Sequence, residues 1–353
     1  MKFVAYLICS VLLIAVFVAP VEAAKNGKCY ALALQGGGDK AAYQAGALAE
    51  IIAEKGEEAQ YDVITGVGIG AINGAILAAH PKGDEQAAID EILALWGNLK
   101  EKDVYKGWSW GGAIRGILFK SALYDSSPFR KLLKKTIKSP VRLFEVLATN
   151  AADGTPKIWN QDVDLDTLVK AIDASSAYPG FFDPVSDIDE NTYYDGGTSF
   201  SINLSGAINR CRDLGYAEED IVIDSILCSA ATIKEKDTSD YTSIPMLIRY
   251  LEIRLYYDTM DLLERAKDGY RKIDFRYTIA PTKRLTSGLL PFSFNSKQIK
   301  NMISTGREDA KKAIALGEEK STEMILDYTK LKVSHQFKGD YADYLADHLA
   351  DHN

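Results

Sequence analysis

The sequence has little histidine, little cysteine and no excess of positive charge. It holds four histidines and four cysteines in 353 residues, and its formal net charge is -8 at pH 7. So acidic a chain is a poor candidate for binding nucleic acid or for electrostatic docking on anionic lipid. The widely spaced cysteines carry no metal-ligand signature, so we expect neither a metal nor a cofactor. Proline-rich or serine-rich linkers and internal repeats are also absent, which favours a single domain.

Long apolar runs are missing from the chain except at its N-terminus, MKFVAYLICSVLLIAVFVAPVEA. Lys2 precedes the run, which covers residues 3–18 and is shorter than the roughly 20 residues of a spanning helix. Val21 and Ala23 flank Glu22, as at an A-x-A-like cleavage site. We therefore expect a signal peptide over residues 1–23 and a secreted or extracytoplasmic mature protein.

In an oxidising compartment, the cysteines of the mature chain can form one disulfide. Cys29, Cys211 and Cys228 remain after cleavage, so one thiol stays free, and the sequence leaves the pairing open. The tripeptide Asn-Leu-Ser that begins at Asn203 is a glycosylation sequon if the host is a eukaryote.

Two strand–glycine–helix units open the mature sequence. "CYALALQGGGDKAAYQAGALAEIIAEKG" predicts a strand over 30–34, a glycine loop over 36–38 and a helix after it. A second strand over 61–65 runs through "TGVGIGA" into a helix of small residues. This alternation predicts an α/β fold with a mainly parallel central sheet.

Later segments extend this pattern. "RLFEVLATNAADGTPKIW" predicts a β-hairpin about Asp153-Gly154, and "DIVIDSILCSA" is typical of a buried central strand. The amphipathic segment 241–270 predicts a covering helix, or one that lines a lipid pocket or docks a partner. Trp108, Trp110 and Phe119 belong either to a lid over an acyl groove or to the core.

The glycine turn after the second strand has the layout of a nucleophile elbow, G-x-S-x-G, with Gly68 where the elbow needs serine. A glycine-rich turn at a helix N-terminus presents free N–H groups to an anion or oxyanion. Residues 66–71 also fit the dinucleotide fingerprint G-x-G-x-x-A. The fingerprint requires a following strand with an acidic residue at its end, but residues 84–99 have a helical pattern. A nucleotide-binding α/β protein is therefore the disfavoured alternative.

Taken together, the glycine loop, the elbow and "YYDGGTS" resemble the patatin-like phospholipase family. "LALQGGGDKAAYQAGAL", "ITGVGIGAINGAILA", "ASSAYPGFFDPV" and "YYDGGTS" follow the family's order, and "PFSFNSKQIKNMISTGREDA" is similar to its late helix. The resemblance implies a patatin-like three-layer α/β/α sandwich. Because no linker interrupts the chain, we expect a single domain over 24–332, and the polar composition of residues 333–353 predicts a loose tail. It also implies hydrolysis of lipid acyl esters by a serine–aspartate dyad without histidine.

The resemblance assigns roles to individual residues. Asp195 matches the base of the dyad, and Gly68 occupies the position of the nucleophile. The residues that match the oxyanion loop are Gly36, Gly37 and Gly38, with Lys40 at the basic position beside them. Two departures count against ordinary activity, because Gly68 has no attacking oxygen and Ala41 replaces the last glycine of the loop.

Two functional hypotheses follow. The first is a catalytically impaired patatin-fold protein that binds a lipid or acyl-ester ligand or a protein partner. The second is an active lipid acyl hydrolase that uses Asp195 with water or with a substitute nucleophile. The hydroxyls near the motifs are those of Thr65, Thr198 and Ser199, and the histidines, His80, His335, His348 and His352, have no visible link to the elbow. Peripheral contact with a membrane stays open.

Overall fold

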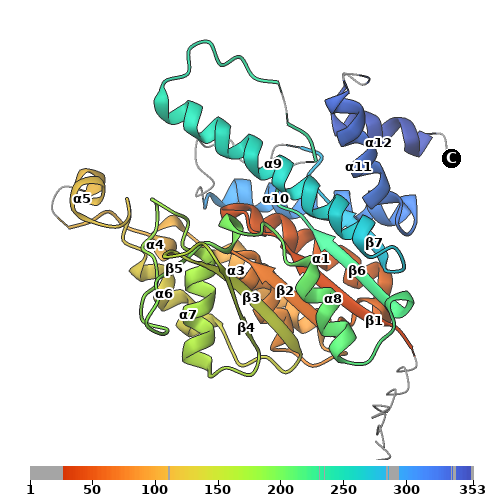
Figure 1. Cartoon of the computed structure of the whole chain (residues 1–353), viewed down its shortest axis with the longest axis horizontal. Coiled ribbons are helices and arrows are strands. Elements are labelled where there is room, and N and C mark those ends of the chain that lie inside the picture. The colour runs from red at the N-terminus through yellow and green to blue at the C-terminus, as the bar shows by residue number, and fades with distance from the viewer. Residues whose placement is uncertain are drawn as a thin grey trace, which may run out of the picture.

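A seven-stranded sheet forms the centre of the computed structural model, which describes residues 27–109, 112–229, 231–233, 235–283, 285, 294–334, 336 and 339–350 (Figure 1). Its strands lie in the order β4-β3-β2-β1-β6-β7, and β5 also pairs with β3. The strands are β1 (Cys29–Leu34), β2 (Val63–Val67), β3 (Leu143–Asn150), β4 (Pro156–Asn160), β5 (Tyr193–Tyr194), β6 (Ile221–Ile226) and β7 (Asp274–Ile279). The α/β prediction is confirmed.

Most of the sheet is parallel, as predicted. β1 pairs in parallel with β2 and β6, β2 pairs with β3, and β6 pairs with β7. β4 and β5 run antiparallel to β3, so the predicted hairpin about Asp153-Gly154 is confirmed. The carboxyl ends of β1, β2, β3, β6 and β7 therefore lie along one edge of the sheet.

Helices bury both faces of the sheet. Along β1, Leu32 and Leu34 point into one core, whereas Ala31 and Ala33 point into the other. The first core is built with α1 (Ala41–Lys55), α2 (Gly70–Ala78), α3 (Glu85–Asn98), α7 (Leu165–Ser176) and α10 (Ser296–Leu316). The second is built with α8 (Leu204–Asp213), α9 (Ser243–Gly269), α11 (Lys320–Val333) and α12 (Tyr341–Ala350). Burial on both sides explains why the strands are apolar along their whole length.

The late helix predicted from the sequence packs closely on the first one. A Cβ on Gly46 of α1 would lie 2.0 Å from the carbonyl oxygen of Ile303, and a Cβ on Gly306 of α10 would lie 2.1 Å from that of Tyr43. Glycine is therefore required on both helices, because their backbones are in contact at the crossing.

The segment between α3 and β3 forms three short helices, α4 (Glu101–Val104), α5 (Gly112–Phe119) and α6 (Ser127–Thr136). The indole of Trp108 donates a hydrogen bond to the carbonyl of Ala122 at 3.0 Å, whereas Phe119 is 77% exposed. Phe119 is therefore not a core residue. Trp110 lies outside the described residues.

The C-terminal segment differs from the expected loose tail. Residues 341–350 form α12, in which Tyr341, Tyr344 and Leu345 are buried. The ring of Tyr341 packs 5.6 Å from that of Tyr328 on α11. The three buried residues recur at the spacing of one helix face, which explains why this otherwise polar segment docks.

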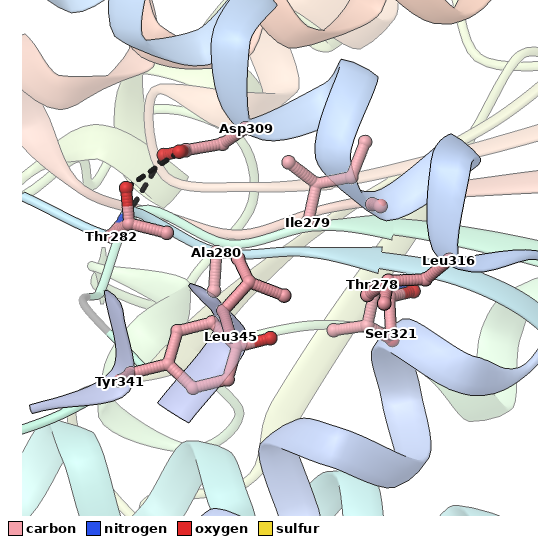
Figure 2. Close-up of a pocket in the computed structure, with 10 residues that line it drawn as sticks. Thr278, Ile279, Ala280, Thr282, Asp309, Leu316, Ser321, Tyr341 and Leu345 are labelled. Carbon is pink, nitrogen blue, oxygen red and sulfur yellow. Dashed lines mark hydrogen bonds between the residues drawn. The ribbon is translucent and has the colours of Figure 1, made fainter. Parts of the chain in front are cut away.

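A small cavity lies between β7, α10 and the C-terminal helices (Figure 2). Its volume of about 10 Å³ is that of a single water site. Asp309 accepts hydrogen bonds there from the hydroxyl of Thr282 at 2.6 Å and from its N–H at 3.0 Å. This cavity is too small for a lipid and lies away from the glycine motifs.

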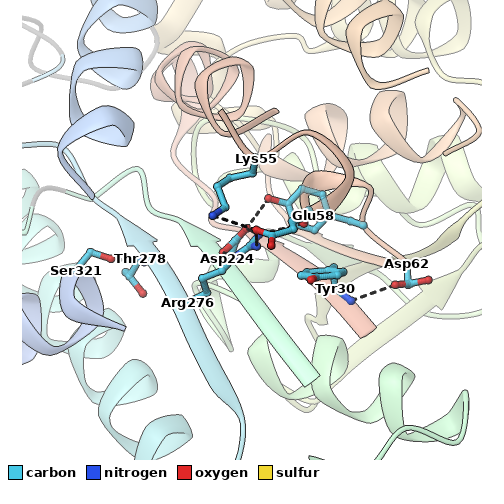
Figure 3. Close-up of polar contacts among 9 residues, drawn as sticks. Tyr30, Lys55, Glu58, Asp62, Asp224, Arg276, Thr278 and Ser321 are labelled. Carbon is cyan, nitrogen blue, oxygen red and sulfur yellow. Dashed lines mark hydrogen bonds and ion pairs between the residues drawn. The ribbon is translucent and has the colours of Figure 1, made fainter. Parts of the chain in front are cut away.

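A buried ion pair joins β6 to β7 (Figure 3). The guanidinium of Arg276 binds the carboxylate of Asp224 at 2.6 Å, and Tyr61 donates to the same carboxylate at 2.7 Å. Burial alone would lower the pKa of Arg276, but the hydrogen bonds and charge of Asp224 outweigh it and raise this pKa. The two buried charges therefore pair with each other, and Glu58 gives Arg276 a second carboxylate partner at 3.1 Å.

The disulfide pairing, which the sequence leaves open, is between Cys29 of β1 and Cys211 of α8. Their Cα atoms are 5.9 Å apart, and 182 residues separate them along the chain. Cys228 is free and buried. Within the described residues, no helix is both long and apolar enough to cross a membrane.

Candidate functional site

The predicted elbow is a turn between β2 and α2. β2 ends at Val67, and Gly68 follows with φ of +57°, in the left-handed region. The N–H of Gly68 donates to the hydroxyl of Ser175 on α7 at 2.8 Å, and this hydroxyl donates to the carbonyl of Leu147 on β3. Ser175 therefore ties the turn to its neighbours. The elbow's strand–turn–helix geometry is present.

Only one of the three glycines in the elbow could accept a side chain after a small shift of its neighbours. A Cβ on Gly66 would lie 2.4 Å from Cα of Ala71, and a Cβ on Gly70 would lie 2.6 Å from the carbonyl oxygen of Gln35. At Gly68 the nearest atom to such a Cβ is Cα of Gly36, at 3.2 Å. Close packing thus requires glycine at 66 and 70, but it does not require glycine at 68.

Asp195 lies beside Gly68. A Cβ built on Gly68 would be 3.6 Å from Oδ1 of Asp195, although 126 residues separate the two positions. Asp195 directly follows β5, where its N–H donates to the carbonyl of Ala177 and its carbonyl accepts from the hydroxyl of Thr149. Gly196 is packed so tightly that a Cβ would lie 2.1 Å from the carbonyl oxygen of Leu147. The Asp-Gly-Gly turn is therefore fixed against β3.

The carboxyl group of Asp195 titrates near neutral pH. Burial raises its pKa to about 7, although the residue keeps some exposed surface, and a hydrogen bond from the N–H of Gly197 lowers this pKa to a smaller extent. Burial, and then the charge of Asp195, raise the pKa of Tyr178 to about 12. A carboxyl group with a pKa near 7 is suited to exchanging a proton at physiological pH.

The predicted oxyanion loop contacts the elbow. Gly36 lies against Gly68, and its N–H donates to the carbonyl of Ser201 at 3.3 Å. In the part of the chain that the structure describes, the N–H groups of Gly37 and Gly38 donate to no acceptor. These two groups are therefore the ones available to a carbonyl oxygen or an oxyanion.

A comparison with protein families identifies this arrangement. A family model described as patatin-like phospholipase matches residues 32–208, which are 177 of the 353 residues. The chain belongs to the patatin-like phospholipase family. The match includes the glycine loop, the elbow and Asp195, so this patatin-like protein has the fold of lipid acyl hydrolases, a family whose ligands are lipids.

Two further comparisons were made. No curated protein sequence matches this patatin-like protein. Among solved structures, VipD from Legionella pneumophila is similar with a TM-score of 0.48 and 13% sequence identity, over 84% of this chain and 68% of VipD.

Lys40 and Ala41 follow the predicted oxyanion loop. Ala41, which replaces the last glycine, has φ of -64° and ψ of -14°, so its methyl group sits on ordinary helical backbone. Lys40 is partly exposed at the end of the short 3-10 turn Gly38–Lys40. Burial raises the pKa of the nearby Cys228 thiol to about 12, and the charge of Lys40 lowers it less. Because Ala41 has ordinary helical dihedral angles, its methyl group does not strain the loop.

The hydroxyls considered as substitute nucleophiles have other partners or are exposed. Thr65 is fully buried and donates to the carbonyl of Asn203 at 2.9 Å. The hydroxyl of Ser199 pairs with that of Thr149 at 3.0 Å, and Thr198 is exposed. Ser175, which contacts Gly68 directly, had no role in the sequence analysis, although it lies within the quoted segment "ASSAYPGFFDPV".

The two described histidines, His80 and His348, lie outside this arrangement. His80 pairs with Glu91 at 3.0 Å, and the ring of His348 contacts the carbonyl of Tyr344 at 2.9 Å. His335 and His352 fall outside the described residues. Among the residues that are described, no group of three or more His, Cys, Asp and Glu is placed to hold a metal.

The sequon at Asn203 is buried. Asn203 caps α8, where its side-chain oxygen accepts from the N–H of Gly206 at 3.0 Å and its amide donates to Glu145 at 3.2 Å. A glycan on this nitrogen would break the contact with Glu145 and occupy a closed site, so the folded protein does not present this sequon.

Proposed function

We propose that this patatin-like protein binds a lipid acyl group at the site formed by Gly68, Asp195 and the glycine loop, and does not cleave it by covalent acyl transfer. The family supplies the class of ligand, which is lipid. The observation that carries the proposal is that position 68 has room for a side chain beside a carboxyl group, yet it provides no nucleophilic atom.

The absence of an attacking oxygen is the argument against turnover. Covalent acyl transfer forms a bond between a side-chain oxygen or sulfur and the acyl carbon. Gly68 has no such atom, and Thr65 and Ser199 are bound to other groups. When serine proteases lose a member of the triad, about 10³ to 10⁴ of the acceleration over water remains. We therefore expect at most slow hydrolysis.

The groups that would hold a ligand are retained. The N–H groups of Gly37 and Gly38 are oriented by the turn that precedes α1 and can donate to an acyl oxygen. Because the pKa of Asp195 is about 7, a large fraction of this carboxyl is protonated at neutral pH and can also donate a hydrogen bond. These donors favour an ester carbonyl or a fatty-acid carboxylate.

A second candidate function is slow hydrolysis by water. The observation in its favour is the carboxyl group of Asp195, which has a pKa of about 7 and lies 3.6 Å from the Cβ position of residue 68. A water molecule between the two has room to attack an acyl carbon while Asp195 accepts its proton. Activity that depends on Asp195 would favour this candidate.

We also propose that the mature protein is secreted or extracytoplasmic. The apolar N-terminal run and the small residues before Ala24 support this proposal. The disulfide between Cys29 and Cys211 also supports it, because such bonds persist in oxidising compartments. Mass spectrometry of the protein recovered from the culture medium tests this proposal, and we expect the mature chain to begin at Ala24.

Binding of palmitate tests the proposed site. A Gly68→Met variant places a side chain between Gly36 and Asp195, and we expect it to weaken palmitate binding by about tenfold or more. Gly56→Met is the matched control, because Gly56 has φ of +53° and a Cβ there would meet nothing within 4 Å. Equal affinities in the two variants, measured by calorimetry, would place the ligand elsewhere.

A further inference from the structure

α9 is much longer than the sheet on which it packs. Its 27 residues span about 40 Å, whereas the six residues of β6 or β7 span about 20 Å. Thr259, in the middle of α9, accepts a hydrogen bond from Gln35 at 2.7 Å, just after the carboxyl end of β1. The helix then runs back to the start of β7. Residues 243–255, called the projecting half, therefore extend beyond the edge that holds Gly68 and Asp195 (Figure 1).

The projecting half is apolar and unburied. None of its residues is buried, and the first buried residue of α9 is Tyr256. Ile244 is 64% exposed and Leu247 is 57% exposed. The other apolar residues of this half, all exposed or partly exposed, are Pro245, Met246, Ile248, Tyr250, Leu251, Ile253 and Leu255. A helix segment that exposes this many apolar side chains is normally covered.

Apolar residues occupy more than one side of the projecting half. At 100° per residue, Ile244, Leu247 and Leu251 fall on one side, whereas Met246 and Ile253 fall on nearly the opposite side. A flat protein surface contacts one side of a helix. A lipid layer surrounds an inserted helix end, so this distribution favours lipid over a second copy of the chain.

The charges around the projecting half are paired with one another. Glu252 is bound by Lys236 at 2.6 Å and by Arg249 at 3.0 Å, and Arg254 pairs with Asp258 at 3.3 Å. No unpaired basic cluster is therefore present on this part of α9 to attract anionic lipid, and the chain as a whole carries a charge of -8. The exposed Tyr250 follows the apolar residues 244–248 along the helix. A tyrosine at this place would lie at the membrane interface if those residues were inserted.

We propose that the projecting half of α9 inserts into the surface of a zwitterionic lipid layer and brings the edge with Gly68 and Asp195 to that surface. This inference rests on the proposed function, because the bound acyl group would come from the same layer. Apolar burial provides the affinity, so binding is insensitive to salt and gains nothing from anionic lipid.

Flotation with phosphatidylcholine vesicles tests this proposal. The unmodified protein is expected to float with the vesicles at low and at high salt, and the Ile244→Glu/Leu247→Glu double variant is expected to partition at least about tenfold less. Val141→Glu is the matched control, because Val141 is also 64% exposed but lies before the amino end of β3, at the opposite edge. Its partition should equal that of the unmodified protein.

Three results would overturn the proposal. One is an unmodified protein that does not float, and another is an equal loss in the α9 double variant and in Val141→Glu. The third is binding only to vesicles that contain phosphatidylserine. A dimer in solution that the α9 double variant dissociates, without vesicle binding by either form, would assign this surface to a second copy.

Palmitate binding measured in parallel keeps the two proposals separate. Vesicle flotation without palmitate binding would contradict the proposed ligand site but would still support the insertion of α9 into lipid. Palmitate binding without flotation contradicts the α9 surface alone.

Discussion

A Gly68→Ser substitution should turn this protein into an esterase. The added Cβ would lie 3.6 Å from Oδ1 of Asp195 and 3.2 Å from Cα of Gly36, so it fits after a shift of a few tenths of an ångström. Because φ is +57°, the new side chain carries a strain of about 1–2 kcal/mol. For a chain of this size, that strain corresponds to a loss of about 1–3 °C in Tm.

The gain in activity follows from the geometry. The introduced hydroxyl can attack an acyl carbon while Asp195 accepts its proton and the N–H groups of Gly37 and Gly38 stabilise the developing oxyanion. We expect hydrolysis of a short-chain p-nitrophenyl ester to rise at least about 10²-fold over the unmodified protein. Since Asp195 must be ionised to act as a base, the rate should increase with pH through about 7.

Two controls isolate the hydroxyl from the strain. Gly68→Ala adds the same Cβ without an oxygen, and Gly56→Ser adds a serine at φ of +53° in an open position. Both should lose stability to a similar extent and gain no activity. If Gly68→Ser folds and remains inactive, the argument that the elbow lacks only its nucleophile is refuted, because the oxyanion loop or the pocket must also have changed.

Asp195→Asn should raise Tm at pH 8, with a difference that shrinks toward pH 4. Between about pH 4 and pH 7 the folded state holds a proton on Asp195 that the unfolded state has released, so stability falls as the pH rises, and above pH 7 the buried carboxylate costs at most ~4 kcal/mol. A difference that is constant across this pH range, measured by thermal denaturation, would contradict the pKa. Reduction of the disulfide between Cys29 and Cys211 should lower the free energy of unfolding by up to ~5 kcal/mol, given its 182-residue separation, and urea denaturation with and without a reductant checks this. Asp224→Ala removes the buried carboxylate that binds Arg276 and leaves this guanidinium only the half-exposed carboxylate of Glu58, so it should cost up to about 3–5 kcal/mol in the same urea assay, whereas an unchanged midpoint would mean that the buried pair contributes nothing. Produced in a eukaryotic host, the folded protein should carry no glycan on Asn203, and a loss of mass at this site on glycosidase treatment would show otherwise.

Local sequence patterns were sufficient to predict most strands and the turns between them. The elbow could be read from glycine spacing because a strand that turns directly into a helix brings backbones together at Gly66 and Gly70. The hairpin could be read from Asp153-Gly154 because its turn needs a residue at positive φ, which Gly154 provides at +75°. These signals lie within a few residues of the structure that they encode.

Features that depend on contacts between distant segments could not be read in this way. The partner of Cys29 is set by the packing of α8 on β1, and no spacing rule indicates it. The hydroxyl of Ser175 reaches Gly68 only because α7 lies beside β3. α12 was missed because its few apolar residues sit among charged ones, and only the buried face at Tyr341 and Leu345 reveals it.

The most direct measurement of the central claim is hydrolysis of a phospholipid and of a short-chain ester by the unmodified protein beside Asp195→Asn. We predict that both proteins hydrolyse either substrate at most about 10³ to 10⁴ times faster than the uncatalysed reaction, and that the two rates are equal. Turnover in the unmodified protein that Asp195→Asn abolishes would contradict the account, because it would show that Asp195 activates water or another nucleophile at Gly68.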